Sequence, residues 1–218
     1  MKRLSIYLVL IVFAGLLAGC QLFGSGDSNS DNPSSSYFPL ATGSTWTYAV
    51  YDSVYSAYHG SNRLDSTSHI RVKVTVLKNV QVDSNHVTSL WQFQFPGQID
   101  TVYVSSASDS VRLKIPTISY GPTTFILPLS IGQKWSGEGI SGTYSVVSVD
   151  TLSFNGMSFS RVYYIVQTPS GSNGHNEFIN IKYWIQPGVG IVKAHYYDSS
   201  TFTPTTNTSW KLLSYNIK

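Results

Sequence analysis

The stretch Ile70-Arg71-Val72-Lys73-Val74-Thr75-Val76 alternates apolar and polar side chains at every position. Successive side chains of a β-strand point to opposite faces, so this period of two puts the isoleucine and three valines on one face and the polar residues on the other. The polar face carries two cations, which is typical of a surface in contact with water. The stretch therefore predicts a strand with one face on a core and the other in solvent.

The same alternation recurs along the chain, and turn signals separate the stretches. The pairs Pro96-Gly97, Asn155-Gly156 and Pro187-Gly188 lie between such stretches, and Asn-Gly is the strongest short signal for a two-residue hairpin. No window shows a 3.6-residue apolar stripe with helix caps. The other strands are predicted at residues 46–51, 91–95, 99–104, 111–115, 142–154, 157–167, 179–185, 189–197 and 210–217.

These stretches predict an all-β protein of about ten antiparallel strands with almost no helix. Unpaired strand edges invite aggregation, so such a sheet must close, fold onto itself or cover its edges. Residues 37–218 are enough for a single domain with a substantial core.

One spacing of residues, PLxxGxxW, occurs twice in the chain. It runs from Pro39 to Trp46 and again from Pro128 to Trp135. Two copies of four matched positions predict a duplicated hairpin, although the flanking residues do not align as a full repeat.

The beginning of the chain has the layout of a secretory signal. Lys2 and Arg3 precede an apolar run that ends in small residues directly before the only cysteine, Cys20. A helix of about 15 residues is too short to cross a hydrocarbon core of ~30 Å. The four residues Leu17-Ala18-Gly19-Cys20 fill every position of the lipobox of bacterial lipoproteins, which they resemble. The resemblance implies a diacylglycerol thioether on Cys20, cleavage before it and acylation of its amine; an ordinary signal peptide that leaves a free thiol is the alternative.

The chain is thus divided into three parts. Residues 1–19 are predicted as a lipoprotein signal peptide, residues 20–36 as the lipidated cysteine with a flexible Gly/Ser/Asp/Asn tether, and residues 37–218 as the all-β domain. Gln21 stands where the inner-membrane retention rule of enteric bacteria, by resemblance, has Asp. We therefore expect a lipid anchor in the outer membrane. The periplasmic face is expected rather than the cell surface, because the acidic cluster that some lipoproteins carry just after the cysteine is limited here to Asp27 and Asp31.

Composition excludes several classes of function. Removal of residues 1–19 takes away two of the 14 basic residues and none of the 11 acidic ones, which leaves a net charge of +1. A basic surface for nucleic acid is therefore not expected. With Cys20 acylated the domain has no thiol, which excludes a disulfide, a zinc–thiolate site and a cysteine nucleophile.

Both ends of the domain resemble a loose group of bacterial lipoproteins with no assigned chemistry. The matching residues are Phe38-Pro39-Leu40, Gly43, Trp46 and Tyr48 at the start, and Tyr183-Trp184, Pro187 to Lys193, Leu212 and Tyr215 near the end. More distantly, the chain is similar to the carrier fold of the lipoprotein localisation factors LolA and LolB. In that fold an antiparallel sheet curves into a half-barrel around an apolar cavity, although the helices that cover that cavity have no counterpart here. The expected architecture is therefore a curved sheet or half-barrel, with a β-sandwich as the alternative.

No motif for catalysis, metal binding or cofactor binding has the context that it needs. The segment 137–142 matches GxGxxG, but a strand follows it where a dinucleotide site requires a helix. His175-Asn176-Glu177 copies the His-x-Glu of zinc deaminases, whose other ligands are cysteines that are missing here. The remaining histidines, His59, His69, His86 and His195, show no metal-ligand spacing. We expect no enzyme, no metal and no cofactor.

Trp184 is the one aromatic residue for which the pattern leaves two interpretations open. It is predicted on the face opposite Ile181 and Ile185, beside Lys182 and Asn180. If that face is concave and open, Trp184 lines a groove for a lipid or a glycan. If a second layer covers the face, Trp184 belongs to the core.

The sequence as a whole favours a non-enzymatic envelope lipoprotein, held at the membrane by its lipid and acting as a binding or structural module. A hydrophobic ligand is the first candidate, and an apolar groove would favour it. Two other classes stay open: a surface glycan-binding protein, which coplanar exposed aromatics would favour, and an envelope enzyme with a site assembled from scattered aspartates and histidines.

Overall fold

The computed structural model describes residues 36–55, 64–117, 121–137, 142–169, 178–199 and 204–218. The predictions on Cys20 and the tether, on His59 and on His175-Asn176-Glu177 lie outside these residues, as does most of the GxGxxG segment. Among the residues that are described, no helix is long and apolar enough to span a membrane.

Within the described residues, twelve antiparallel strands form one sheet, in the order β6-β5-β4-β3-β2-β1-β12-β11-β10-β9-β8-β7. Two six-stranded meanders, β1 to β6 and β7 to β12, are joined where β1 pairs with β12. The strands are β1 Thr45–Tyr55, β2 Leu64–Asp83, β3 His86–Phe95, β4 Gln98–Ala107, β5 Ser110–Leu113, β6 Thr123–Ile126, β7 Lys134–Ser136, β8 Gly142–Phe154, β9 Met157–Pro169, β10 Phe178–Gln186, β11 Gly190–Ser199 and β12 Thr205–Asn216.

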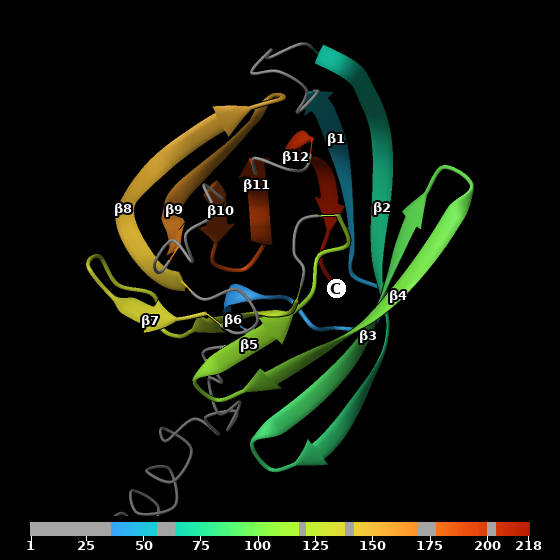
Figure 1. Ribbon diagram of the computed structural model, residues 1–218. Coiled ribbons are helices and arrows are strands. Elements are labelled where there is room, and N and C mark those ends of the chain that lie inside the picture. Colours follow the sequence, from blue (N-terminus) through green and yellow to red (C-terminus); the bar gives the residue numbers. More distant parts are fainter. Residues whose placement is uncertain (1–35, 56–63, 118–120, 138–141, 170–177, 200–203) are drawn as a thin grey trace, which may run out of the picture. The chain divides into compact units, whose positions relative to one another are not determined.

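The sheet curls until its two edge strands, β6 and β7, come together (Figure 1). The prediction of an all-β, antiparallel, curved sheet is confirmed, and all strands belong to one sheet rather than to the two sheets of a sandwich. The described part of the chain has twelve strands instead of about ten, because β6 and β7 have four and three residues and were not predicted.

The core lies on the inner face of the curved sheet. Val72, Val74 and Val76 are at most 1% exposed, whereas Arg71 and Lys73 between them are exposed, as the alternation predicts. Burial of these side chains on one face is worth roughly 1.5–3 kcal/mol each. The other buried strand residues are mostly apolar, so the inner face is mainly apolar, whereas the outer face carries polar residues together with apolar ones such as Tyr51 and Val147.

The two PLxxGxxW segments have the same backbone geometry. Gly43 has φ of 87° and Gly132 has φ of 82°, the left-handed region that glycine adopts without strain. The N–H of Gly43 donates to the carbonyl of Val76, and the N–H of Gly132 donates to the carbonyl of Val146, both at 2.9 Å. In each copy the valine N–H donates back, at 3.0 Å, to the residue that follows the glycine. The predicted duplication is therefore present in the structure, at the start of each six-stranded meander.

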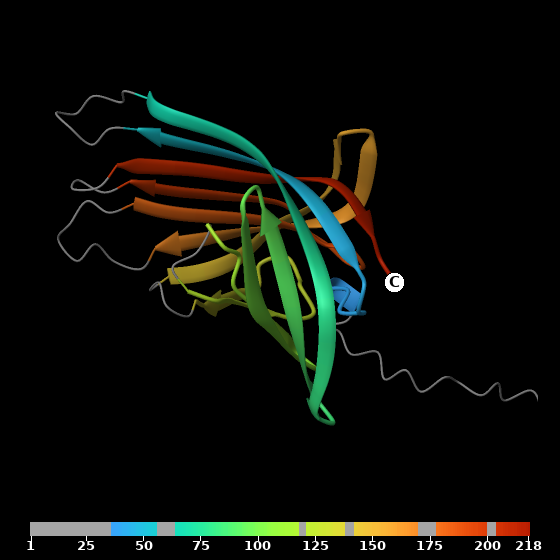
Figure 2. The same cartoon turned by 90° about the vertical axis from the view of Figure 1, so that its right-hand side faces the viewer.

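β2 is the longest strand, and it belongs to two parts of the sheet. Its first half pairs with β1, and its second half pairs with β3. Figure 2 shows β2 bending away from β1 as it leads into β3 and β4. Residues 77–83 of β2 are exposed, so this end of the strand lies beyond the core.

Candidate functional site

The two sequence motifs at the ends of the domain meet on the inner face of the sheet. The indole Nε1 of Trp46 donates to the carbonyl of Val189 at 2.7 Å, and the hydroxyl of Tyr48 donates to the carbonyl of Ile191 at 2.8 Å. Between these two contacts lies Gly190, with φ of 91°, and a Cβ placed there would lie 3.6 Å from the ring of Phe38. The Phe-Pro-Leu…Trp-x-Tyr segment is thus fastened to the Pro-Gly-Val-Gly turn.

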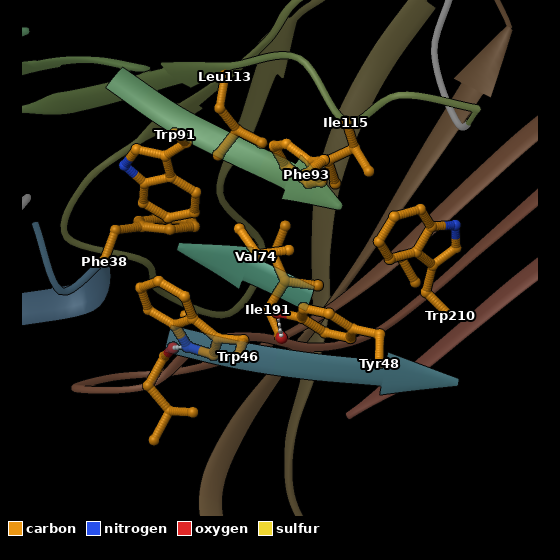
Figure 3. Close-up of a pocket in the computed structure, with 13 residues that line it drawn as sticks. Phe38, Trp46, Tyr48, Val74, Trp91, Phe93, Leu113, Ile115, Ile191 and Trp210 are labelled. Carbon is orange, nitrogen blue, oxygen red and sulfur yellow. Dashed lines mark hydrogen bonds between the residues drawn. The ribbon is translucent and has the colours of Figure 1, made fainter. Parts of the chain in front are cut away.

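An apolar cavity of about 30 Å³ lies where these segments meet (Figure 3). Such a volume has room for one or two waters, or for a methyl group, and is far below the ~300–1,000 Å³ of sites for drug-sized ligands. Its walls are formed by Phe38, Trp46, Tyr48, Val74, Trp91, Phe93, Leu113, Ile115, Val189, Gly190, Ile191, Ala194 and Trp210.

Six of the thirteen residues that line the cavity are aromatic. The rings of Trp46 and Trp91 stack with centroids 5.0 Å apart and 17° between their planes. Trp210 meets the ring of Tyr48 edge-on at 5.5 Å and that of Phe93 at 6.3 Å. Figure 3 shows these rings grouped around Val74 of β2. Trp210 thus contacts two other rings of the wall, and Trp46 and Trp91 contact each other.

Two buried donors of this wall have no hydrogen-bond partner. The Nε1 atoms of Trp91 and Trp210 are unpaired within the part of the chain that the structure describes, whereas that of Trp46 is paired. In Figure 3 the nitrogens of Trp91 and Trp210 lie at opposite ends of the cluster, each turned away from Val74. An unpaired buried N–H costs about 1–3 kcal/mol, so an acceptor oxygen at either position would be stabilised.

Tyr48 is the titratable residue among those that line the cavity, and its phenol is neutral at neutral pH. Burial raises the pKa of Tyr48 above its usual range. Burial and the neighbouring Tyr163 raise the pKa of Tyr37 to about 12. The hydroxyl of Tyr37 accepts from the N–H of Leu129 at 3.2 Å. The cavity therefore presents an uncharged surface at neutral pH.

The edge strands β6 and β7 meet without backbone pairing among the described residues. The indole Nε1 of Trp135 donates to the carbonyl of Thr124 at 2.7 Å, and the side chain of Gln133 donates to the carbonyl of Ile126 at 3.2 Å. Side chains here replace the backbone ladder that joins every other pair of neighbours in the sheet. We call this contact the seam.

Trp184 lies on the outer face of the sheet. The alternation was predicted correctly, since Ile181 and Ile185 are buried on the inner face. The ring of Trp184 stacks on that of Tyr164 with centroids 4.9 Å apart. The Nζ of Lys193, on β11, lies 4.2 Å from the centroid of the Trp184 ring. Trp184 lines neither the apolar cavity nor the open hollow described next, and its role in a ligand groove stays a prediction.

A second, open hollow of about 690 Å³ lies beside Ser36, where the described chain begins. Both polar and apolar residues line it, and Asn79 there donates from its side chain to the carbonyl of Leu40 at 2.5 Å. The hollow is lined by Ser36, Pro39, Leu40, Ala41, Asn79, Gln81, Val87, Gly188, Ile217 and Lys218.

The structure separates the predicted candidate histidines. His69 stacks on Tyr51, His86 contacts Asp83 at 2.8 Å, and His195 contacts the side-chain oxygen of Asn207 at 2.8 Å. Within the described ranges, no group of three His, Cys, Asp or Glu residues is placed to hold a metal ion.

Sequence reasoning missed the aromatic wall of the cavity. Trp91, Phe93 and Trp210 were assigned to strands but not to a site. The signal that could have found them was the alternation of apolar and polar residues, because all three occupy apolar positions of alternating strands and are therefore expected on the inner face. The alternation does not show which strands face one another across the interior.

No protein-family model and no curated protein matches the chain. Similar solved structures include an exported protein of Bacteroides fragilis described as having a YmcC-like fold, with 12% identity and a TM-score of 0.49 over 83% of this chain and 98% of that one. A lipoprotein of Parabacteroides distasonis has 12% identity and a TM-score of 0.48 over 83% of this chain and 99% of that one. An outer-membrane lipoprotein-sorting protein domain of Vibrio parahaemolyticus has 12% identity and a TM-score of 0.23 over 81% of this chain and 86% of that one. At these scores the function has to be argued from the residues of this chain.

Proposed function

We propose that the protein is a non-enzymatic lipoprotein of the bacterial envelope whose β domain binds an apolar ligand group inside its curved sheet. The observation that carries the proposal is the apolar cavity at which the two motif-bearing ends of the domain meet. An acyl chain offers the matching chemistry, because its methylenes suit aromatic and aliphatic walls.

The size of the cavity sets a condition on this function. In the closed form the free volume accepts little more than a methyl group, so a longer chain needs the sheet to widen. Widening costs least at the seam, where the hydrogen bonds of Trp135 and Gln133 stand in for a ladder. Ligand uptake is therefore coupled to separation of β6 from β7.

The anchor is the second part of the proposal. Cys20 carries the lipid that holds the domain at the outer membrane, on its periplasmic side. Two or more acyl chains bind a bilayer stably, whereas one chain does not. The variant Cys20→Ala should no longer incorporate labelled palmitate and should leave the membrane fraction. If that variant incorporates palmitate as the parent does, the proposed anchor is wrong.

Ligand binding can be measured with the mature protein in phosphatidylcholine vesicles and a brominated stearic acid, whose bromines quench indoles on contact. In a Trp184→Phe background, which removes the outer indole, we expect saturable quenching. The additional change Val74→Ile puts a methylene into the cavity and should weaken the quenching, because the chain end has lost its space. Quenching that follows lipid content without saturation, and is equal with and without Val74→Ile, would contradict the proposal.

A further inference from the structure

The outer face of the sheet carries a row of cations and aromatic rings that do not line the apolar cavity. Cross-strand pairs connect Tyr164 on β9 to Trp184 on β10, Trp184 to Lys193 on β11, and Lys193 to Lys211 on β12. Lys211 pairs with Ala49 on β1, and Ala49 pairs with Arg71 on β2. We call these six positions the outer row.

Two lysines are direct partners in the outer row. Like charges that face each other across an antiparallel pair destabilise a sheet, because their Cα atoms are only about 4.5–5.5 Å apart. Burial, with the charges of Lys211 and Lys182, lowers the pKa of Lys193. The fold thus holds two cations together at a cost that a bound anion would remove.

Aromatic rings support the lysines from both sides. The Nζ of Lys193 lies 4.2 Å from the centroid of Trp184, which itself stacks on Tyr164. The Nζ of Lys211 lies 6.0 Å from the centroid of Tyr51, a ring that is 44% exposed and stacks on His69 at 4.3 Å. These stacks restrict the lysine side chains, which lowers the entropy lost when a ligand binds.

Few carboxylates lie on the part of this face that the structure describes, and none of them is in the outer row. In β9 to β12, β1 and β2 the carboxylates are Asp52 and Asp198, which accept from Thr208 and Tyr196 toward the inner side, and Asp65 and Asp83 near the two ends of β2. Asp150 stands on the neighbouring β8 and accepts from Ser148 at 2.5 Å.

None of the row's cations makes an ion pair within the described residues. Lys182, in the adjoining row, adds a further positive charge beside Lys193. The face is therefore positive, although the mature chain as a whole is almost neutral.

We propose that the outer row binds an acidic polysaccharide, with Lys193 and Lys211 on one anionic group and Arg71 on the next. Lys211 and Arg71 are two strands apart, about 10 Å, with the small Ala49 between them, so a single phosphate cannot reach both ends while a chain of acidic sugars can. The amides and hydroxyls of Asn180, Tyr197 and Asn207 lie along the same face for sugar hydroxyls. This site is independent of the apolar cavity, since it lies on the opposite face of the sheet.

The test uses the mature protein in phosphatidylcholine vesicles and polygalacturonate as the probe. We expect binding that weakens with added salt, and no binding of the fully methyl-esterified polymer, which has the same chain without the charge. Each of Lys193→Gln and Lys211→Gln should weaken binding about tenfold, and the double variant should abolish it. The matched control is Lys78→Gln with Lys114→Gln, which removes the same charge from exposed positions elsewhere and should leave binding unchanged.

Folding provides a second readout that separates a binding role from a structural one. Lys211→Gln should raise the unfolding temperature by about 1–3 °C while it weakens binding, because it removes the repulsion from Lys193. Equal binding by the double variant and its control would overturn the proposal. So would a protein that binds phosphatidylglycerol vesicles and ignores polygalacturonate, since the face would then be a membrane contact.

Discussion

The indole of Trp135 donates to the carbonyl of Thr124 at 2.7 Å, across the one junction of neighbouring strands in the described sheet that has no backbone ladder. At the corresponding junction of the two meanders, β1 and β12 pair from Thr45 with Asn216 to Tyr55 with Thr205. The sheet is therefore joined firmly on one side and by side chains on the other. Any change that admits a ligand to the interior therefore costs least at the seam between β6 and β7.

The variant Trp135→Phe tests the seam. It keeps an aromatic ring against Tyr144, on which Trp135 stacks at 5.5 Å, and removes the N–H that Thr124 accepts. We expect the free energy of unfolding to fall by about 1–2 kcal/mol, and the amides of Thr123–Ile126 to exchange faster with deuterium. Trp184→Phe on the outer face is the control, and equal protection of β6 in both variants would argue against the seam as the opening point.

A comparison of Trp46→Phe with Trp91→Phe tests the two hydrogen-bonding states of the stacked pair. Both changes remove the same atoms from buried rings. Trp46→Phe also leaves the carbonyl of Val189 without its donor, whereas Trp91→Phe removes an N–H that has no partner among the described residues. We expect the loss in unfolding free energy to be larger for Trp46→Phe by about 1–3 kcal/mol. Chemical denaturation measures it, and equal losses would mean that the Trp91 N–H is satisfied in solution.

Val74→Ile and Val72→Ile test whether the cavity is empty space. The two valines stand on the inner face of β2, and only Val74 lines the cavity. One added methylene fits the free volume at Val74 and should leave stability unchanged or raise it by up to ~1 kcal/mol. At Val72 the same methylene meets a filled core and should cost about 1–3 kcal/mol. Thermal unfolding decides, and similar losses at both positions would show that the cavity closes in solution.

The sequence predicts long strands well and short edge strands badly, for a physical reason. In β2 the burial of Val72, Val74 and Val76 follows from alternation, because one face of the strand is buried along that stretch. β6 and β7 are four and three residues long, so neither shows a period. Their place depends on the curl of the whole sheet, which no local pattern encodes.

For the candidate sites, the sequence predicted the positions of the residues but not their partners. The motif residues Trp46 and Val189 are visible in the sequence, but they are 143 residues apart, and their hydrogen bond follows from the order of strands. The position of Trp184 on the outer face was predicted from the alternation of its strand. That Lys193 and Tyr164 are its neighbours follows only from the register of the strand pairs. Local pattern thus assigns a residue to a face, and strand pairing assigns its partners.

His195 gives the protein a stability that depends on pH. Burial lowers the pKa of its imidazole, the hydrogen bond with Asn207 opposes this, and the charges of Lys182 and Lys193 lower the pKa further. A base whose pKa is lower in the folded state binds protons more readily when unfolded, so protonation favours unfolding. The destabilising effect of His195 is absent well above pH ~6.5, the ordinary pKa of histidine. It grows as the pH falls below that value toward the pKa of the folded state.

The variant His195→Gln isolates this contribution, because every other titrating group is the same in the two proteins. We expect the unfolding free energy of the parent to fall relative to that of the variant between pH 8 and pH 5, with the difference appearing near pH ~6.5. Denaturation at a series of pH values measures it. A constant difference would mean that His195 titrates alike in both states, and a difference of opposite sign would mean that an anion on the outer row stabilises the imidazolium beside Lys193.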